Sequence, residues 1–134
     1  MRVGVVVVSH GESGFSMVEA VEKMVGKLDT RIVTVPIGES REITTGRVQK
    51  VCTDLGCDET LFLVDLEGST PFNVCCGSRG KCVILSGVNM PMLFKLATCS
   101  RDQTALELAG ELQRTGQKSI HIRAGGDAGA KVHE

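Results

Sequence analysis

Two side chains that could act together in nucleophilic catalysis each follow a run of apolar residues. His10 comes shortly after Val5–Val8 and begins a glycine-containing turn, and Asp65 comes directly after Leu61–Val64. A carboxylate that accepts the Nδ1 proton of an imidazole fixes its tautomer and leaves the Nε2 lone pair free, and it stabilises the positive charge that develops when Nε2 attacks. His10 and Asp65 therefore form a candidate catalytic pair in which the histidine is the nucleophile.

The sequence also predicts an anion site beside His10. Backbone N–H groups at helix N-termini bind anions without any lysine or arginine, and a phosphoryl group is the natural occupant. The residues that would shape or line this site are Gly11, Ser13, Gly14, Ser69 and Thr70. A structural interpretation stays open beside this one, in which His10 only bonds a neighbouring carbonyl, Asp65 is a cap or turn residue, and the glycines shape turns.

Hydrophobic patterning predicts alternating strands and helices along the chain. The expected strands are Arg2–Ser9, Arg31–Ile37, Leu61–Asp65 and Lys81–Ser86, with a further one at Ser119–Arg123. The first helix is expected to bury Met17, Val18, Val21, Met24, Val25 and Leu28, and the second, Ser40–Leu55, to bury Ile43, Val48, Val51, Cys52 and Leu55. Later helices are expected at Thr70–Cys76, from Pro91, and at Asp102–Arg114, the last closed by Gly116.

This alternation predicts an α/β fold: a doubly wound, mainly parallel sheet of four to five strands with helices on both faces. In the flavodoxin-like strand order, the first and third strands are neighbours about 4.8 Å apart. Residues at their carboxyl ends can then touch. His10 and Asp65 lie at those two ends.

Length and composition restrict the function further. The 134 residues are enough for one domain, which we place at residues 1–123, with a mobile tail at 124–134. With 15 basic and 16 acidic residues and no Trp or Tyr, the chain is not expected to bind nucleic acid. The apolar run after Arg2 is too short for membrane insertion, so a cytoplasmic protein is expected.

The six cysteines do not form a Cys-x-x-Cys pair, on which most structural zinc sites and thiol redox motifs depend. They are interpreted as small buried apolar residues. No metal and no cofactor is expected.

Three segments of the chain resemble one known family. They are Val8-Ser9-His10-Gly11, the stretch from Phe62 to Asn73 with its Asp…Thr-Pro-Phe-Asn string, and Ser86-Gly87-Val88-Asn89-Met90-Pro91-Met92-Leu93. In order and separation they are similar to the IIA component of mannose-type sugar phosphotransferase systems, the phosphocarrier of bacterial sugar uptake. The resemblance covers most of residues 1–123.

The resemblance implies that His10 accepts a phosphoryl group from the histidine-containing phosphocarrier protein and passes it to a IIB component. Asp65 matches the carboxylate that orients the histidine, Thr70 a hydroxyl of the phosphoryl pocket, and the loop from Val88 to Met92 a rim of the site. The family also implies a homodimer, in which the strand near residues 119–123 pairs with the partner's sheet.

Such a carrier needs no metal, because the phosphoryl group passes in line between two histidines. Its partners would dock transiently on small apolar patches, for which Phe15, Met90 and Met92 are the candidates.

The sequence also bears on three other functions. A histidine phosphatase would have arginine before the histidine, where this chain has Ser9, and a flavin or nucleotide binder would have a Gly-x-Gly-x-x-Gly turn, which this chain lacks. A regulatory domain of the same family, which signals through protein contacts instead of serving transport, stays open.

Overall fold

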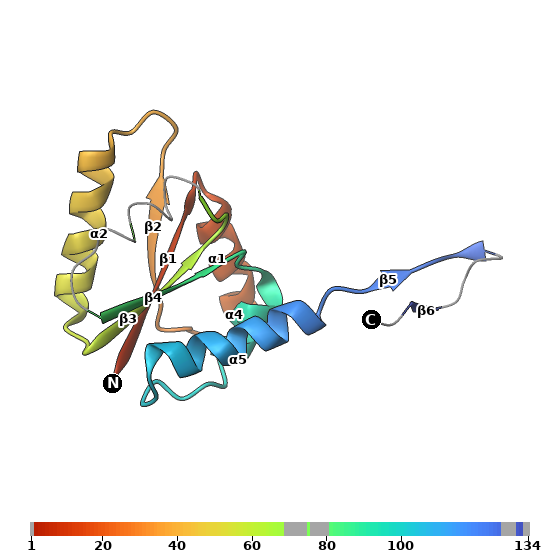
Figure 1. Cartoon of the computed structure of the whole chain (residues 1–134). Coiled ribbons are helices and arrows are strands. Elements are labelled where there is room, and N and C mark those ends of the chain that lie inside the picture. Colours follow the sequence, from red (N-terminus) through yellow and green to blue (C-terminus); the bar gives the residue numbers. More distant parts are fainter. Residues whose placement is uncertain (1, 69–74, 76–80, 127–130, 133–134) are drawn as a thin grey trace.

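A parallel four-stranded sheet forms the centre of the molecule (Figure 1). The computed structural model describes residues 2–68, 75, 81–126 and 131–132. The sheet has the order β2-β1-β3-β4, and each neighbouring pair is parallel. Its strands are β1 (Val3–His10), β2 (Arg31–Val35), β3 (Glu59–Val64) and β4 (Lys81–Ser86). The predicted doubly wound α/β fold and the adjacency of the first and third strands are thus confirmed.

Helices pack on both faces of this sheet and produce two hydrophobic cores. The helices are α1 (Ser13–Val25), α2 (Arg41–Leu55), α4 (Met90–Leu96) and α5 (Ala105–Lys118). Helices α1, α4 and α5 pack against one face, and α2 covers the other (Figure 1). Along β1 the side chains alternate, so that Val5 and Val7 enter the first core while Val6 and Val8 enter the second. This explains why the valine run is apolar throughout.

Side-chain caps determine where three of the helices begin. Ser40 Oγ accepts a hydrogen bond from Ile43 N at the start of α2, and Asn89 Oδ1 accepts one from Met92 N at the start of α4. Thr104 and Glu107 form a reciprocal capping box at the start of α5. Because this box satisfies the first N–H groups, α5 begins three residues later than the sequence pattern predicts.

Three residues predicted to be buried are exposed instead. Met24 and Val25 are 66% and 47% exposed in the last turn of α1, and Ile43 is 58% exposed. In α2 the inward face is defined by Thr44 and Val48, both fully buried. A helix rotates 100° per residue, so Ile43 lies about 140° from Val48 and points away from the sheet.

Two further boundaries differ from the prediction, one because of a local turn and one because of packing between helices. Strand β2 stops at Val35, because residues 36–39 form a turn in which Glu39 N donates to Pro36 O. Helix α5 does not end at Gly116, which is buried within it and faces Met92. The predicted helix at Thr70–Cys76 falls almost wholly outside the described residues.

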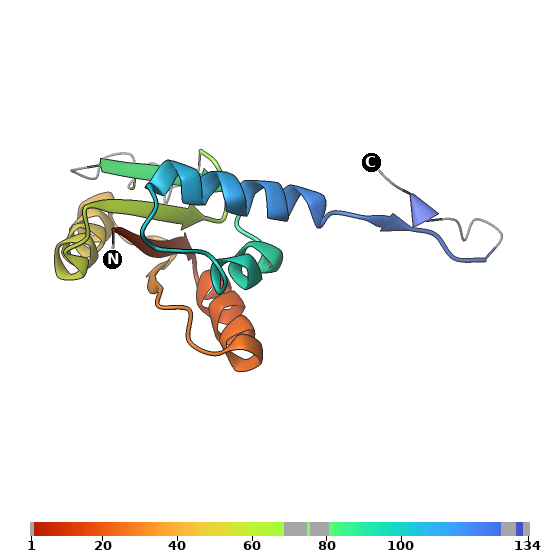
Figure 2. The ribbon, with the colours of Figure 1, turned by 90° about the horizontal axis from the view of Figure 1, so that it is seen from below.

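The C-terminal strand does not join the main sheet. Strand β5 (Ile122–Arg123) pairs antiparallel with β6 (Lys131–Val132), and this two-stranded unit projects away from the domain beyond α5 (Figures 1 and 2). Ile120 and Ile122 are more than half exposed on this extension. Within the described part of the chain, no helix combines the length and the apolar character needed to span a membrane.

Candidate functional site

The predicted catalytic pair meets at the carboxyl edge of the sheet. His10 is the last residue of β1, and Asp65 directly follows Val64, the last residue of β3. Since Val8 is paired with Val64, the chain places these two residues on adjacent strands at the same edge. Asp65 Oδ2 lies 3.0 Å from His10 Nδ1 and accepts a second hydrogen bond, also of 3.0 Å, from the backbone N–H of His10.

This geometry fixes the orientation of the imidazole ring. With Nδ1 bound to Asp65, the tautomer that fits the network carries its proton on Nδ1 and its lone pair on Nε2. The His10 side chain is 41% exposed and that of Asp65 is 22% exposed. No described residue forms a hydrogen bond with Nε2. The arrangement presents a nucleophilic nitrogen to solvent and a carboxylate behind the ring.

The two carboxylate oxygens of Asp65 differ in their hydrogen bonds. Oδ1 is buried and has no hydrogen-bond partner among the described residues. The hydrogen bonds that Asp65 forms with this part of the chain thus both go to His10.

The backbone around His10 is fixed by a second set of polar contacts. Gly11 N donates to Val35 O on the neighbouring strand at 3.0 Å, and Ser13 Oγ donates to His10 O at 3.0 Å. Ser9, which is fully buried, accepts a hydrogen bond from Gly14 N at 2.9 Å. The β1–α1 turn is therefore tied to β2, to β3 through Asp65, and to the first turn of α1.

Gly14 has a different role from the one predicted. Its N–H donates to Ser9 Oγ and is not available to an anion, so its assignment as a phosphoryl-binding donor is wrong in this structure. A Cβ at this position would lie 2.4 Å from Ser9 Oγ and 2.8 Å from Val7 Cγ1, so only glycine allows this close approach. Gly11 and Ser13 do lie in the turn beside His10, whereas Ser69 and Thr70 lie outside the described residues.

The predicted docking residues divide into exposed and buried ones. Phe15 is 43% exposed in the first turn of α1, and Met90 is partly exposed at the start of α4. Met92 is only 5% exposed and packs in the core between α4 and α5, so it is not a docking residue.

Sequence reasoning missed three residues near this edge. Ile37 is 98% exposed in the β2–α2 turn, and Leu66, the neighbour of Asp65, is 63% exposed. The third is buried Ser9, for which the sequence pattern predicts only a place in a strand and not its hydrogen bond with Gly14. The signal for Ile37 was available, since an isoleucine between Pro36 and Gly38 occupies a turn and not a strand.

No metal centre or disulfide is found in the described part of the chain. No group of three or more His, Cys, Asp or Glu side chains there could hold a metal ion. Cys75 is buried, while Cys52, Cys57, Cys82 and Cys99 are partly exposed, so the prediction of burial fails for these four. Burial and the hydrogen bond from its thiol to Glu111 raise the pKa of Cys99 to about 11, which keeps it protonated and unreactive near neutral pH.

Comparisons with known proteins agree on one family. The family model described as PTS system fructose IIA component matches residues 4–113. The PTS system fructose-specific EIIA component of Bacillus subtilis (strain 168) is 23% identical over 126 residues, which cover 90% of this chain and 86% of that protein.

Solved structures of similar proteins have the same fold. The mannose/sorbose-specific IIA subunit of the phosphotransferase system from Enterococcus faecalis superposes with a TM-score of 0.83 at 26% identity, over 95% of this chain and 98% of that one. The phosphotransferase system component EIIA from Streptococcus agalactiae gives a TM-score of 0.78 at 22% identity, over 89% and 95% of the two chains.

Proposed function

Since the chain belongs to the fructose- and mannose-type IIA family of the phosphotransferase system, we propose that it carries a phosphoryl group on His10 Nε2 between two other proteins. The observation that carries this proposal is the contact of Asp65 Oδ2 with His10 Nδ1. It leaves Nε2 as the nucleophile and places a negative charge where the ring becomes positive.

The transfer is an in-line exchange of one N–P bond for another. The Nε2 lone pair attacks phosphorus, the donor's N–P bond breaks, and its electron pair returns to the donor's nitrogen. The proton on Nδ1 stays in place, and Asp65 stabilises the imidazolium that results. The second transfer repeats these steps with His10 as the donor. Positioning and electrostatics supply the catalysis, and neither step consumes water.

The family and the exposure of the ring support the identity of the partners. We propose the histidine-containing phosphocarrier protein as donor and a IIB component as acceptor, with all three in the cytoplasm. A homodimer is part of the same proposal, with residues 119–123 in contact with the second copy. The exposed Ile120 and Ile122 support this contact.

A phosphorylation assay tests the proposal. Incubation with the phosphorylated donor should label His10 in an acid-labile, base-stable form, and His10→Ala should abolish the label. His121→Ala, which changes a histidine near the start of the C-terminal extension, is the matched control and should label normally. Persistence of the label in His10→Ala would disprove the proposal. Discharge of the label to a IIB component distinguishes transport from a regulatory role.

A further inference from the structure

The β2–α2 turn is closed by a hydrogen bond and exposes a large apolar side chain. In the four-residue turn 36–39, Glu39 N donates to Pro36 O at 3.2 Å, and Gly38 has a φ of +88°. That value is the one required at the third position of a type II turn. Ile37 occupies the second position and is 98% exposed. An isoleucine in this position gives up the stabilisation that burial of its side chain would bring.

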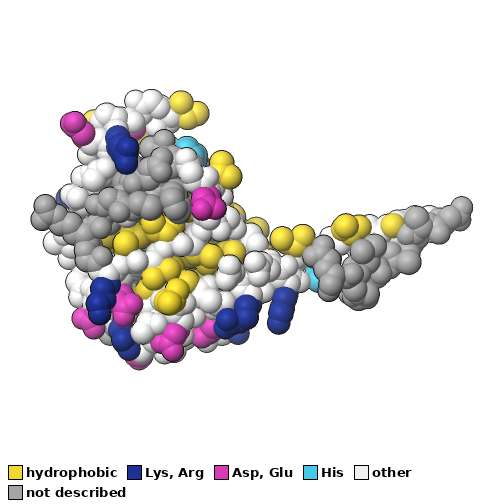
Figure 3. Space-filling view, in the orientation of Figure 1, with side chains coloured by type: hydrophobic (Ala, Val, Ile, Leu, Met, Phe, Trp, Pro, Cys, Tyr) yellow, Lys and Arg dark blue, Asp and Glu magenta, His cyan; other side chains and the backbone are white. Residues whose placement is uncertain are grey.

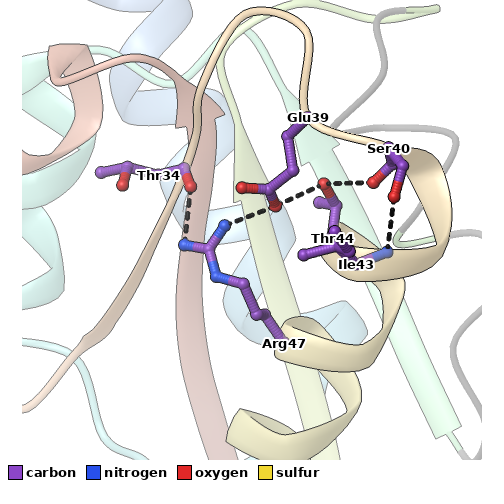
Figure 4. Close-up of polar contacts among 6 residues, drawn as sticks. All are labelled: Thr34, Glu39, Ser40, Ile43, Thr44 and Arg47. Carbon is purple, nitrogen blue, oxygen red and sulfur yellow. Dashed lines mark hydrogen bonds and ion pairs between the residues drawn. The ribbon is translucent and has the colours of Figure 1, made fainter.

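A partly buried polar network ties the two sides of this turn together (Figure 4). Arg47, from the second turn of α2, donates to Thr34 O at the end of β2 and to Glu39 Oε1 at the start of α2, at 2.8 Å and 2.7 Å. The fully buried Thr44 donates to the same carboxylate oxygen at 2.8 Å. One guanidinium therefore joins Thr34, two residues before the turn, to Glu39, the last residue of the turn.

The turn lies within reach of any protein that contacts His10. Val35, the last residue of β2, is the register partner of His10, so their Cα atoms are about 4.8 Å apart. Ile37 is two residues further, which places its Cα at most about 12.5 Å from that of His10. A transient interface buries about 600 Å² on each partner, equivalent to a disc of about 14 Å radius. An interface of this size that is centred near His10 therefore extends far enough to reach Ile37.

Two other exposed apolar side chains follow His10 and Asp65 closely in the sequence. Phe15 is 43% exposed on α1, and Leu66 is 63% exposed beside Asp65. In the space-filling view, hydrophobic side chains lie at the surface near the histidine-coloured atoms at the upper end of the molecule (Figure 3). A histidine whose Nδ1 is already bound offers only Nε2 to a phosphorylated partner.

We propose that Ile37 is a docking residue for the protein that donates the phosphoryl group, and that Arg47 is the positioning residue that holds the turn for it. This inference rests on the proposed function and extends it to a recognition element outside the catalytic pair. The donor is expected to present an apolar depression next to its phosphorylated side chain, into which Ile37 inserts.

The test compares a protein donor with a small one. In Ile37→Ser, the KM for the phosphorylated donor protein should rise about tenfold or more, because an apolar contact of 1.4 kcal/mol corresponds to a factor of ten, while kcat stays near the wild-type value. Phosphoramidate, a small chemical donor that needs no docking surface, should label His10 in this variant at the wild-type rate. Leu106→Ser is the matched control: this leucine is 70% exposed at the start of α5, near the opposite edge of the sheet, and its loss should leave both reactions unchanged.

A double-mutant cycle tests the role of Arg47. Arg47→Gln should also raise the KM for the donor protein and leave phosphoramidate labelling unchanged. If Arg47 acts through the turn, the double variant Ile37→Ser/Arg47→Gln should have the KM of Ile37→Ser alone. Multiplicative effects would overturn the positioning role.

The outcomes separate this inference from the proposed function. A wild-type KM in Ile37→Ser, with normal labelling of His10, would overturn the inference and leave the proposed function intact. Absence of labelling by the donor protein in the wild type would overturn both.

Discussion

The β1–α1 and β2–α2 turns lie at the same edge of the sheet and use their polar and apolar groups in opposite ways. In the β1–α1 turn, polar groups from three elements converge on one residue, so that the ring of His10 is held by its nitrogen and the surrounding backbone by Asp65, Ser13 and Val35. In the β2–α2 turn, the polar groups are satisfied internally by Arg47 and an apolar side chain is left in solvent.

The difference indicates a division of labour. A nucleophile needs an electrostatic partner and a fixed orientation, which the first turn supplies. A contact for a transient partner needs apolar area on a rigid frame, because less conformational entropy is then lost on binding. In our proposal, chemistry and recognition therefore belong to neighbouring loops, each with its own supporting network.

The largest expected effect comes from the first turn. Asp65→Asn keeps the size of the side chain but removes the charge that stabilises the imidazolium, so the rate of transfer should fall about 10²-fold or more. The KM for the donor should change little, because docking depends on the second turn. Rapid-quench measurement of His10 labelling checks this, with circular dichroism as the control for folding. An unchanged rate would remove Asp65 from the mechanism.

A second prediction concerns the frame of the first turn. Gly14→Ala places a methyl group against Ser9 Oγ and Val7, and should lower the free energy of unfolding by about 1–3 kcal/mol. Ser9→Ala removes the buried acceptor of Gly14 N and should cost a similar about 1–3 kcal/mol. Urea denaturation of both variants measures this. Gly46→Ala, at a helical position with open space, should not destabilise the protein and is the control.

The smallest expected effect is the pH dependence of the second turn. Hydrogen bonds from Thr44 and Arg47 lower the pKa of Glu39 below 4.5. A carboxylate whose pKa is lowered by folding stabilises the native state above its unfolded pKa, and this contribution is lost as the pH falls through the lower folded value. The difference in urea midpoint between wild type and Arg47→Gln should therefore be present at pH 7 and shrink below about pH 4.5. A difference that is constant down to pH 3 would show that Glu39 does not take part in the network.

Strand positions and the catalytic pair were predictable because they depend on short-range pattern and on a general rule. A run such as Val5–Val8 is buried on both faces, and parallel strands bring their carboxyl ends together, so His10 and Asp65 had to meet once β1 and β3 were neighbours. The start of α4 was also predicted to within one residue, because Pro91 marks a first helical turn.

Positions that depend on packing between elements were not predictable in the same way. The residue type of Met92 suits a docking surface, but its side chain is buried between α4 and α5. The residue type of Gly14 suits an anion-binding loop, but here the lack of a side chain allows close packing against Ser9. In each case the residue type permits both roles, and the neighbour across the fold selects one.

By itself, the order of residues determined the alternation of strands and helices and indicated the two side chains that we propose carry the chemistry, because burial patterns and strand ends are local properties. Only the tertiary structure decided which polar groups are already used and which apolar ones remain in solvent. That distinction depends on contacts between segments distant in the chain, such as Asp65 with His10 and Arg47 with Thr34. Those contacts distinguish the β1–α1 and β2–α2 turns from ordinary turns.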